Sequence, residues 1–475
     1  MEKTLYWHDY ETWGADPSRD RPSQFAGLRT DLDLNPIGEP LVIYCKPADD
    51  LLPQPEACLV TGITPQKAAA VGLIEAEFIA KIHSELSQPG TCGVGYNSIR
   101  FDDEVTRYTL YRNLYDPYAR EWQYGNSRWD IIDMVRLTFA LRPEGINWPK
   151  YPDGKQSFRL EQLTAANGIA HESAHDALSD VEATIALARL IRQQQPRLYD
   201  YIFKQRKKRQ VAEMLNLKSA EPVVHISSMY SSECGCMAIV MPLVKHPSNP
   251  NGVIVYDLSH APKVLLTLNE DEIHHRLYTA SADLPEGVER IPLKTIHLNK
   301  APVVVPMNTL TDEAIERWGV DLAAIKRHRQ QILEAADLKQ KILSVHQKTA
   351  FEPITDPDRM LYCGGFFSDA DRIKMDSIRR LAPAELAEYP LDFDDDRLPE
   401  MLFRYRARNW PELLSTDERD RWEEYRYQRL HDKEGGGSIA ITEYNKCLHE
   451  LRNLPEQTDN QALFNALIAW GESVK

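Results

Sequence analysis

The sequence predicts an α/β domain, then a small β-barrel, then an α-helical region, and three observations lead to this order. In residues 1–195, short apolar runs typical of strands alternate with longer segments of helical periodicity, which is the pattern of a sheet covered by helices. Between about residues 222 and 307, short β segments are broken by Pro, Asn and Gly, as in a small barrel. From residue 351 onward the pattern is helical again. The predicted domains are therefore 1–195, 196–350 and 351–475.

The elements of the first domain follow from their periodicity. Strands are expected where short apolar runs end at polar or turn residues, and these are Thr4–Thr12, Pro40–Cys45 and Thr91–Tyr96. Helices are expected where apolar residues recur at helical spacing, and these are Glu75–Leu86, Asp103–Tyr115, Ile131–Leu141 and Ala177–Gln193. The basic run Lys204–Arg209 follows the last helix and is either a nucleic-acid contact or a solvated helix face.

The barrel region and the C-terminal region can be assigned in the same way. The clearest β segments are Pro222–Ile226, Met237–Met241, Gly252–Tyr256 and Ala301–Val305. A helical stretch near Leu322–Gln347 closes the second domain. In the C-terminal region, Gly435–Ser438 is expected to be a flexible loop.

Composition and charge exclude several classes of protein. The chain has 475 residues, 43% of them hydrophobic and 27% charged, which is typical of a soluble protein with several domains. No apolar run approaches the roughly 20 residues that span a bilayer, and residues 1–9 lack the apolar stretch of a signal peptide. We therefore expect a cytoplasmic protein with no membrane contact. The net charge of −15 disfavours nucleic-acid binding over the whole surface, so any such binding needs basic residues gathered locally.

Two carboxylates stand at the end of the first expected strand. Because strand side chains alternate, Leu5, Trp7, Asp9 and Glu11 share one face, with the apolar pair in the core and the acidic pair at the strand end. Neighbouring carboxylates repel each other, and a divalent cation relieves this repulsion. The alternative is a solvated strand end without function.

Two further segments add carboxylates and a histidine. Asn97–Phe101 is expected to form a turn after an apolar strand, with Asp102 at the start of the next helix. The structural alternative for Asp102 is a helix cap. His175 lies five residues before Asp180, so the two would not share a face of one helix. We therefore expect His175 in the preceding loop and Asp180 on the helix.

These groups suit phosphodiester hydrolysis with two metal ions. Attack by hydroxide adds negative charge to the phosphodiester, and two Mg²⁺ ions roughly 3.5–4 Å apart can bind the attacking and leaving oxygens. Oxygen ligands suit Mg²⁺ or Mn²⁺ and disfavour Zn²⁺. We expect Asp9, Glu11, Asp102 and Asp180 to bind two Mg²⁺ ions, for which Mn²⁺ can substitute, and His175 to accept the proton of the attacking water.

The combined D-x-E, N-x-x-x-F-D and H-x-x-x-x-D motifs resemble the DEDD exonuclease superfamily of the histidine type, and further segments resemble its exonuclease I family. These segments extend over nearly the whole chain and are His8–Thr12, Asp20–Pro22, Gln24–Ala26, Tyr44–Pro47, Arg142–Pro149 and Gly365–Asp371. The resemblance implies an α/β ribonuclease H-like exonuclease domain, a small SH3-like β-barrel domain and an α-helical C-terminal domain.

The same resemblance implies an activity and roles for individual residues. It implies a 3′→5′ exonuclease that degrades single-stranded DNA processively to 5′-mononucleotides in DNA repair and recombination. The metal-binding acids match Asp9, Glu11, Asp102 and Asp180, and the general base matches His175. Glu11 and Arg159 match positions that contact the substrate.

Contacts outside the catalytic centre are expected at three arginines. Single strands are held by cationic grooves with aromatic side chains, and Arg404 and Arg406 flank Tyr405 and precede Trp410. We expect both arginines to contact DNA, and the alternative is an amphipathic helix with its aromatic residues in the core. By the resemblance, Arg142 is expected to contact the acidic C-terminal tail of single-stranded-DNA-binding protein. We expect the chain to be a monomer.

Two other interpretations stay open from the sequence alone. The same motifs suit a proofreading subunit or a ribonuclease acting on RNA ends, although the two additional domains argue against both. A catalytically silent DNA-binding protein would lack at least one of the metal-site acids, and all four are present. No G-x-x-x-x-G-K-[ST] run supports a polymerase or ligase.

Overall fold

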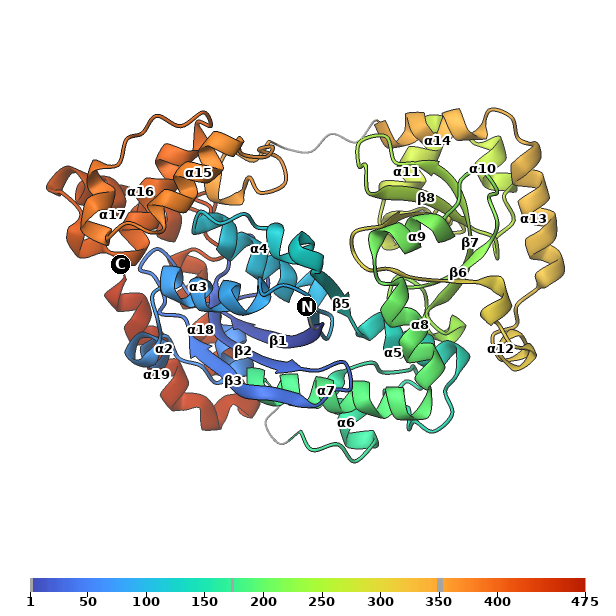
Figure 1. Ribbon diagram of the computed structural model, residues 1–475, viewed down its shortest axis with the longest axis horizontal. Coiled ribbons are helices and arrows are strands. Elements are labelled where there is room, and N and C mark those ends of the chain that lie inside the picture. The colour runs from blue at the N-terminus through green and yellow to red at the C-terminus, as the bar shows by residue number, and fades with distance from the viewer. Residues whose placement is uncertain (1–2, 172–174, 348–352, 475) are drawn as a thin grey trace. The chain divides into compact units, whose positions relative to one another are not determined.

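The computed structural model describes residues 3–171, 175–347 and 353–474, and the chain folds into two compact units (Figure 1). The first unit contains Met1–Ser127, His171–Ile185 and Pro353–Lys475. The second unit contains Arg128–Ala170 and Ala186–Glu352. The C-terminal region therefore shares a unit with the N-terminal region. The domain boundaries expected from the sequence stay a prediction.

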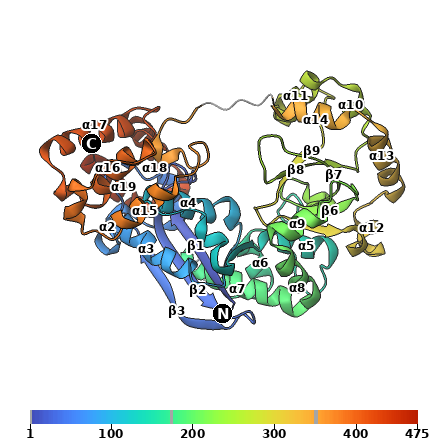
Figure 2. The same cartoon turned by 45° about the horizontal axis from the view of Figure 1, so that its top comes forward.

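A mixed sheet forms the centre of the first unit. Its five strands are β1 (Thr4–Thr12), β2 (Pro22–Thr30), β3 (Pro36–Tyr44), β4 (Thr91–Gly95) and β5 (Ser127–Asp130), in the order β3-β2-β1-β4-β5. Strand β1 pairs antiparallel with β2 and parallel with β4, and Figure 2 shows β1, β2 and β3 side by side. Leu5 and Trp7 of β1 are buried as expected. Strand β2 was not predicted, because its proline, glycine and polar residues hide the strand pattern.

Helices from both ends of the chain pack around this sheet. They are α1 (Pro55–Thr61), α2 (Pro65–Val71), α3 (Glu75–Leu86), α4 (Asp102–Arg112), α15 (Asp369–Ile378), α16 (Arg397–Asn409), α17 (Thr416–His431), α18 (Ile441–Arg452) and α19 (Gln461–Ser473). One core joins Tyr10 of β1 to Phe78 of α3. Another joins Trp13 to Tyr444 and Phe464, so residues more than 400 positions apart share one core.

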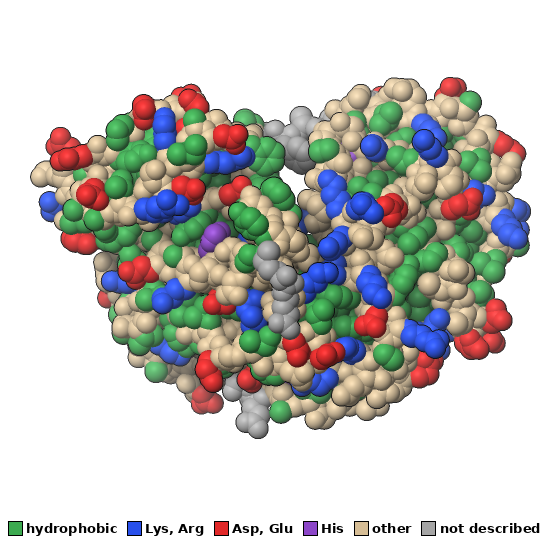
Figure 3. Space-filling view, in the orientation of Figure 1, with side chains coloured by type: hydrophobic (Ala, Val, Ile, Leu, Met, Phe, Trp, Pro, Cys, Tyr) green, Lys and Arg blue, Asp and Glu red, His purple; other side chains and the backbone are tan. Residues whose placement is uncertain are grey.

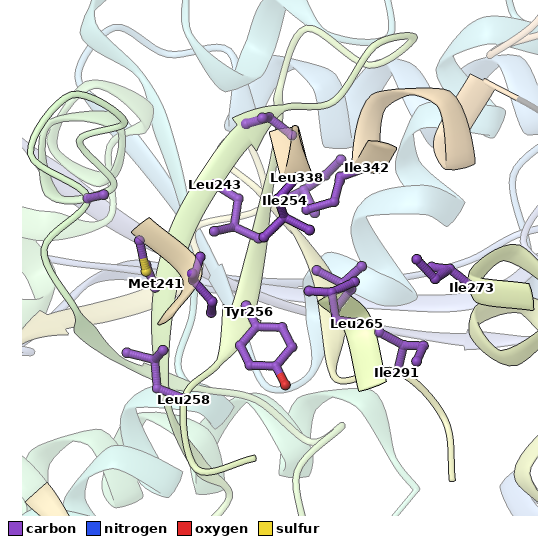
Figure 4. Close-up of a cluster of buried hydrophobic side chains, with 14 of the residues drawn as sticks. Met241, Leu243, Ile254, Tyr256, Leu258, Leu265, Ile273, Ile291, Leu338 and Ile342 are labelled. Atoms are coloured by element: carbon purple, nitrogen blue, oxygen red, sulfur yellow. The ribbon is translucent and has the colours of Figure 1, made fainter. Parts of the chain in front are cut away.

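Helices surround a second, antiparallel sheet in the second unit. Its strands are β6 (Val223–Ile226), β7 (Met237–Lys245), β8 (Gly252–Asp257), β9 (Leu293–His297) and β10 (Val303–Pro306), in the order β10-β6-β7-β8-β9. Four of these strands lie where the sequence predicts them. Strand β9 was missed, because it has only two fully buried positions. Met241, Ile254 and Tyr256 pack with Leu338 and Ile342 in its core (Figure 4).

The second unit also contains the following helices. They are α5 (Ile132–Leu141), α6 (Leu160–Ala166), α8 (Pro196–Gln205), α9 (Lys208–Met214), α10 (Lys263–Thr267), α11 (Glu270–Tyr278), α12 (Asp312–Arg317), α13 (Leu322–Glu334) and α14 (Leu338–Gln347). The basic run Lys204–Arg209 thus lies where α8 ends and α9 begins. Among the residues described, no helix combines the length and apolar character needed to cross a bilayer.

Candidate active site

The end of β1 carries Asp9 and Glu11, as the strand alternation predicts. Asp9 pairs with Ala26 and Glu11 with Gln24 of β2, and the register shifts directly after Glu11. The side chain of Glu11 is nearly buried, and that of Asp9 is partly buried. The paired strands therefore hold two carboxylates at one place with little water around them.

Asp102 is held against this strand end. A turn of 3₁₀ helix, Ser98–Arg100, follows β4, and α4 begins at Asp102, as expected. The backbone N–H of Tyr10 donates a hydrogen bond to Oδ1 of the buried Asp102 at 2.9 Å. Because Tyr10 lies between Asp9 and Glu11, this bond fixes Asp102 beside the acidic pair. The helix-cap alternative does not explain a contact with β1.

Helix α7 (Ala177–Gln194) brings the third segment to the same place. Asp180 lies in its first turn and His175 in the preceding loop, as predicted. His175 is exposed and has a left-handed backbone with φ of 68°, which a residue with a Cβ seldom adopts. Donor atoms of Glu11, His175 and Asp180 lie within 4.8 Å of one another. The structure thus assembles all five predicted catalytic residues within the first unit.

The carboxylates of this cluster raise one another's pKa values. Burial, followed by the nearby charges of Asp102 and Glu11, raises the pKa of Asp9 well above its ordinary value. Burial and the charges of Asp180 and Asp102 raise the pKa of Glu11 to about 8. These shifts mean that burial and the neighbouring carboxylates disfavour the ionised forms of Asp9 and Glu11. An all-oxygen donor set with excess negative charge fits divalent cations such as Mg²⁺ or Mn²⁺.

Two side chains at the site were missed by the sequence analysis. Nε2 of His171 lies 2.5 Å from Oδ1 of Asp180. Asp176 directly precedes α7 and accepts a hydrogen bond from the backbone N–H of Ser179 in the first turn of that helix at 3.2 Å. The charge of Asp176 also raises the pKa values of Asp9 and Glu11. The run from His171 to Asp176 contains two histidines and two carboxylates, and that density was an available signal.

Arg159 and Arg142 belong to the second unit. The guanidinium of Arg159 is 64% exposed and lies 3.9 Å from Glu161, so most of its donors face solvent. Arg142 follows α5 and donates to the backbone oxygens of Leu141 and Thr309 at 2.6 and 3.2 Å. The contacts predicted for them, with substrate and with an acidic tail, stay predictions.

Arg404 and Arg406 lie on α16 with their guanidiniums paired inside the chain. Arg404 donates to Asp356 at 2.6 Å and to Glu400 at 2.7 Å, and Arg406 donates to Glu418 through two nitrogens. Both arginines are 8% exposed. These contacts give both side chains a structural role that the sequence analysis did not expect, and their contact with DNA stays a prediction.

Exposed aromatic side chains in the first unit were also missed. Trp122 is 65% exposed, Tyr362 56% and Phe366 80%. The ring of Tyr118 lies 6.5 Å from that of Tyr362 and 6.0 Å from that of Phe366, and the Arg107 guanidinium lies 5.3 Å from the Tyr118 ring. Solvent-facing rings beside a cation are groups on which nucleic-acid bases stack.

Basic side chains are grouped in the second unit. Figure 3 shows several Lys and Arg side chains close together on the face of this unit that is turned to the viewer. In the basic run, Lys204, Lys207, Lys208 and Arg209 are exposed. A chain of net charge −15 therefore still offers local positive charge, but which of the two predicted roles the basic run has stays open.

Comparisons with known proteins match every part of the chain. Family models match as follows: an exonuclease model over residues 6–188, an exonuclease I SH3-like domain over 206–348 and an exonuclease I C-terminal domain over 355–474. Exodeoxyribonuclease I of Escherichia coli (strain K12) is 48% identical over 90% of both chains, and that of Haemophilus influenzae is 46% identical over 90% of both.

Solved structures agree with this pattern. Exonuclease I from Methylocaldum szegediense superposes with a TM-score of 0.96 at 53% identity, covering 99% of both chains. E. coli exonuclease I in complex with a dA16 oligonucleotide superposes with a TM-score of 0.95 at 45% identity, covering 100% of both chains. A zinc-bound form of the E. coli enzyme with single-stranded DNA has a TM-score of 0.94 at 44% identity, again covering 100% of both chains.

Proposed function

This chain belongs to the exonuclease I family and is a nuclease, and from that premise we propose that it degrades single-stranded DNA from the 3′ end. The observation that carries the proposal is the convergence of four carboxylates and His175 at the end of β1. Processive release of 5′-mononucleotides, a role in DNA repair and recombination, and a cytoplasmic location are parts of the same proposal.

Asp9, Glu11, Asp102 and Asp180 would hold two Mg²⁺ ions, for which Mn²⁺ can substitute. The raised pKa values of Asp9 and Glu11 support this role, because burial and the neighbouring carboxylates disfavour their ionised forms, which a bound cation would stabilise. When bound, the two cations would supply charge stabilisation to the attacking and leaving oxygens of the phosphodiester. The hydrogen bond from Tyr10 keeps Asp102 in place for this purpose.

His175 would accept the proton of the attacking water. Its exposed side chain can reach water, and its donor atom lies within 4.8 Å of those of Glu11 and Asp180. A ring nitrogen of imidazole can accept a proton from water and release it again. The left-handed backbone at His175 supports a functional role, because strained residues of this kind cluster at active sites.

Single-stranded DNA is the proposed substrate class. Solved structures of the E. coli relative contain single-stranded DNA oligonucleotides. In this chain, the exposed rings of Trp122, Tyr362 and Phe366 offer stacking surfaces that do not read sequence. The exposed Arg159 offers a cation for the phosphate backbone. We further propose that the chain is a monomer and that Arg142 contacts the acidic tail of single-stranded-DNA-binding protein.

Digestion of a 5′-labelled single-stranded DNA with Mg²⁺ tests the proposed activity. We expect a ladder that shortens from the 3′ end, is abolished by EDTA and by Asp9→Ala, and is weak on a matched duplex and on RNA. The RNA arm matters because an oligoribonuclease from Marinobacter nauticus is 32% identical over 28% of this chain. Preference for RNA would overturn the substrate, and an intact strand under all conditions would overturn the activity.

A further inference from the structure

Two histidines lie beside the acidic cluster, and their surroundings differ. His171 lies beyond the end of α6 and its side chain is only 4% exposed, whereas His175 is exposed. Nε2 of His171 lies 2.5 Å from Oδ1 of Asp180, whose own side chain is 18% exposed. Among the residues that the structure describes, the group of closely spaced carboxylate and imidazole donor atoms contains Glu11, His175 and Asp180 but not His171. In this group Glu11 and Asp180 are the proposed metal ligands and His175 is the proposed general base. His171 therefore touches a proposed metal ligand without belonging to the group.

We propose that His171 is a positioning residue that orients the carboxylate of Asp180 for metal binding, an inference that rests on the proposed function. A carboxylate in the first turn of a helix can rotate about its terminal bond. A ring N–H that donates to Oδ1 stops this rotation and leaves Oδ2 for a cation. Because the ring is nearly buried, water competes poorly for the bond. Hydrogen bonds to metal ligands from such neighbouring groups commonly tune metal affinity.

The geometry separates this role from proton transfer. A general base needs a ring nitrogen that reaches the attacking water. Nε2 of His171 is hydrogen-bonded to Asp180, and the side chain of His171 has little access to solvent. His175 is exposed and its donor atom lies near that of Glu11. The structure therefore assigns orientation of Asp180 to His171 and proton transfer to His175.

Metal affinity and turnover, measured separately on the full chain, test this division. Isothermal titration with Mn²⁺ reports affinity, and hydrolysis of a short oligonucleotide at saturating metal reports kcat. We expect His171→Ala to weaken Mn²⁺ binding by about 10–100-fold and to keep much of kcat once metal is saturating. His171→Gln should regain most of the affinity, because its amide N–H can donate to Asp180. His175→Ala should keep the affinity and lower kcat by about 10²–10⁴-fold.

A histidine outside the cluster provides the control. His83→Ala removes a partly buried histidine of α3, outside the cluster, and should leave both readouts unchanged. If His171→Ala fails to fold, His171→Asn gives a shorter side chain that cannot reach Asp180. Wild-type Mn²⁺ affinity in the folded variant overturns the inference alone, as does a loss of kcat without a loss of affinity. A wild-type chain that binds no Mn²⁺ overturns the proposed metal-dependent function as well.

Discussion

The first unit contains two groups of buried charges that differ in how their charge is balanced. In the active-site cluster, carboxylates face carboxylates, and burial together with their mutual repulsion raises the pKa values of Asp9 and Glu11. In the second group, here called the arginine network, each carboxylate faces guanidiniums. Arg21 binds both oxygens of Asp50 at 2.6 and 2.5 Å, and Arg408 donates to Asp358 at 3.0 Å.

The pKa directions in the arginine network are the reverse of those in the cluster. Burial alone would raise the pKa of Asp50, but Arg21 and Arg429 outweigh it and hold the pKa below its ordinary value. Arg408 and Arg404 have the same effect on Asp358. Buried charges that are paired within the chain make the fold sensitive to the loss of either partner, whereas buried carboxylates that face one another are candidates for binding a ligand of opposite charge.

Removal of a network carboxylate should have the largest effect on stability. Asp358 is 4% exposed and accepts hydrogen bonds from both Arg404 and Arg408. Asp358→Ala leaves two buried guanidiniums without this partner, so we expect the free energy of unfolding to fall by about 3–5 kcal/mol. Urea denaturation measures this. Asp376→Ala, which removes a carboxylate that is 55% exposed, should cost less than about 1 kcal/mol. If both variants lose a similarly small free energy of unfolding, the arginine network contributes no more to stability than a surface ion pair.

Removal of a carboxylate from the active-site cluster should instead increase the free energy of unfolding of the metal-free protein. Glu11→Gln removes one of the mutually repelling charges, so we expect the metal-free protein to gain about 1–3 kcal/mol in free energy of unfolding at pH 8. The same variant should lose Mg²⁺-dependent hydrolysis. Denaturation in EDTA measures the stability, and Glu77→Gln at an exposed position of α3 is the control. Destabilisation by Glu11→Gln would mean that the cluster is balanced by contacts other than a metal.

The pH dependence of stability should separate the two groups of charges, with a smaller effect. The folded pKa of Glu11 is raised from 4.5 to about 8, so the folded state binds this proton more tightly than the unfolded state. The free energy of unfolding of the metal-free protein should therefore fall as pH rises from about 4.5 to about 8. The lowered pKa values of Asp50 and Asp358 act in the other direction, and their contribution is lost as pH falls through the acidic range.

Thermal denaturation with and without Mg²⁺ measures this difference. Bound Mg²⁺ should remove the loss of stability that accompanies the rise in pH. We therefore expect Mg²⁺ to raise Tm by roughly 2–4 °C more at pH 8 than at pH 5.5. An equal rise at both pH values would show that the carboxylates of the cluster are ionised in the metal-free protein throughout this range.

The active-site cluster could be predicted from the sequence because its signals are local. Alternation along β1 places Asp9 and Glu11 on one face, and five residues of spacing separate His175 from the helix of Asp180. Local periodicity also predicts most strands, although it misses β2, β5 and β9, and it predicts several of the helices. The predicted three-part fold is confirmed by the matching family models and solved structures.

The arginine network could not be predicted because its partners are distant in sequence. Arg404 and Asp356 are 48 positions apart, and a basic helix face looks alike whether it meets DNA or buried carboxylates. Likewise, the role of His171 depends on a contact with Asp180 across nine positions that carry no periodic signal. Pairings that depend on the tertiary fold leave no pattern in a single sequence.

The shared core of the first unit has a consequence for how the chain folds during synthesis. Trp13 is buried against Tyr444 and Phe464, so its apolar contacts cannot form until the ribosome has made residues more than 400 positions later. The second unit contains no residue beyond Glu352, so all of it is synthesised before the C-terminal part of the first unit. The half that carries the active site is therefore completed after the other half. A nascent chain stalled before residue 353 would hold every predicted catalytic residue but leave the face around Trp13 open to aggregation and to chaperones.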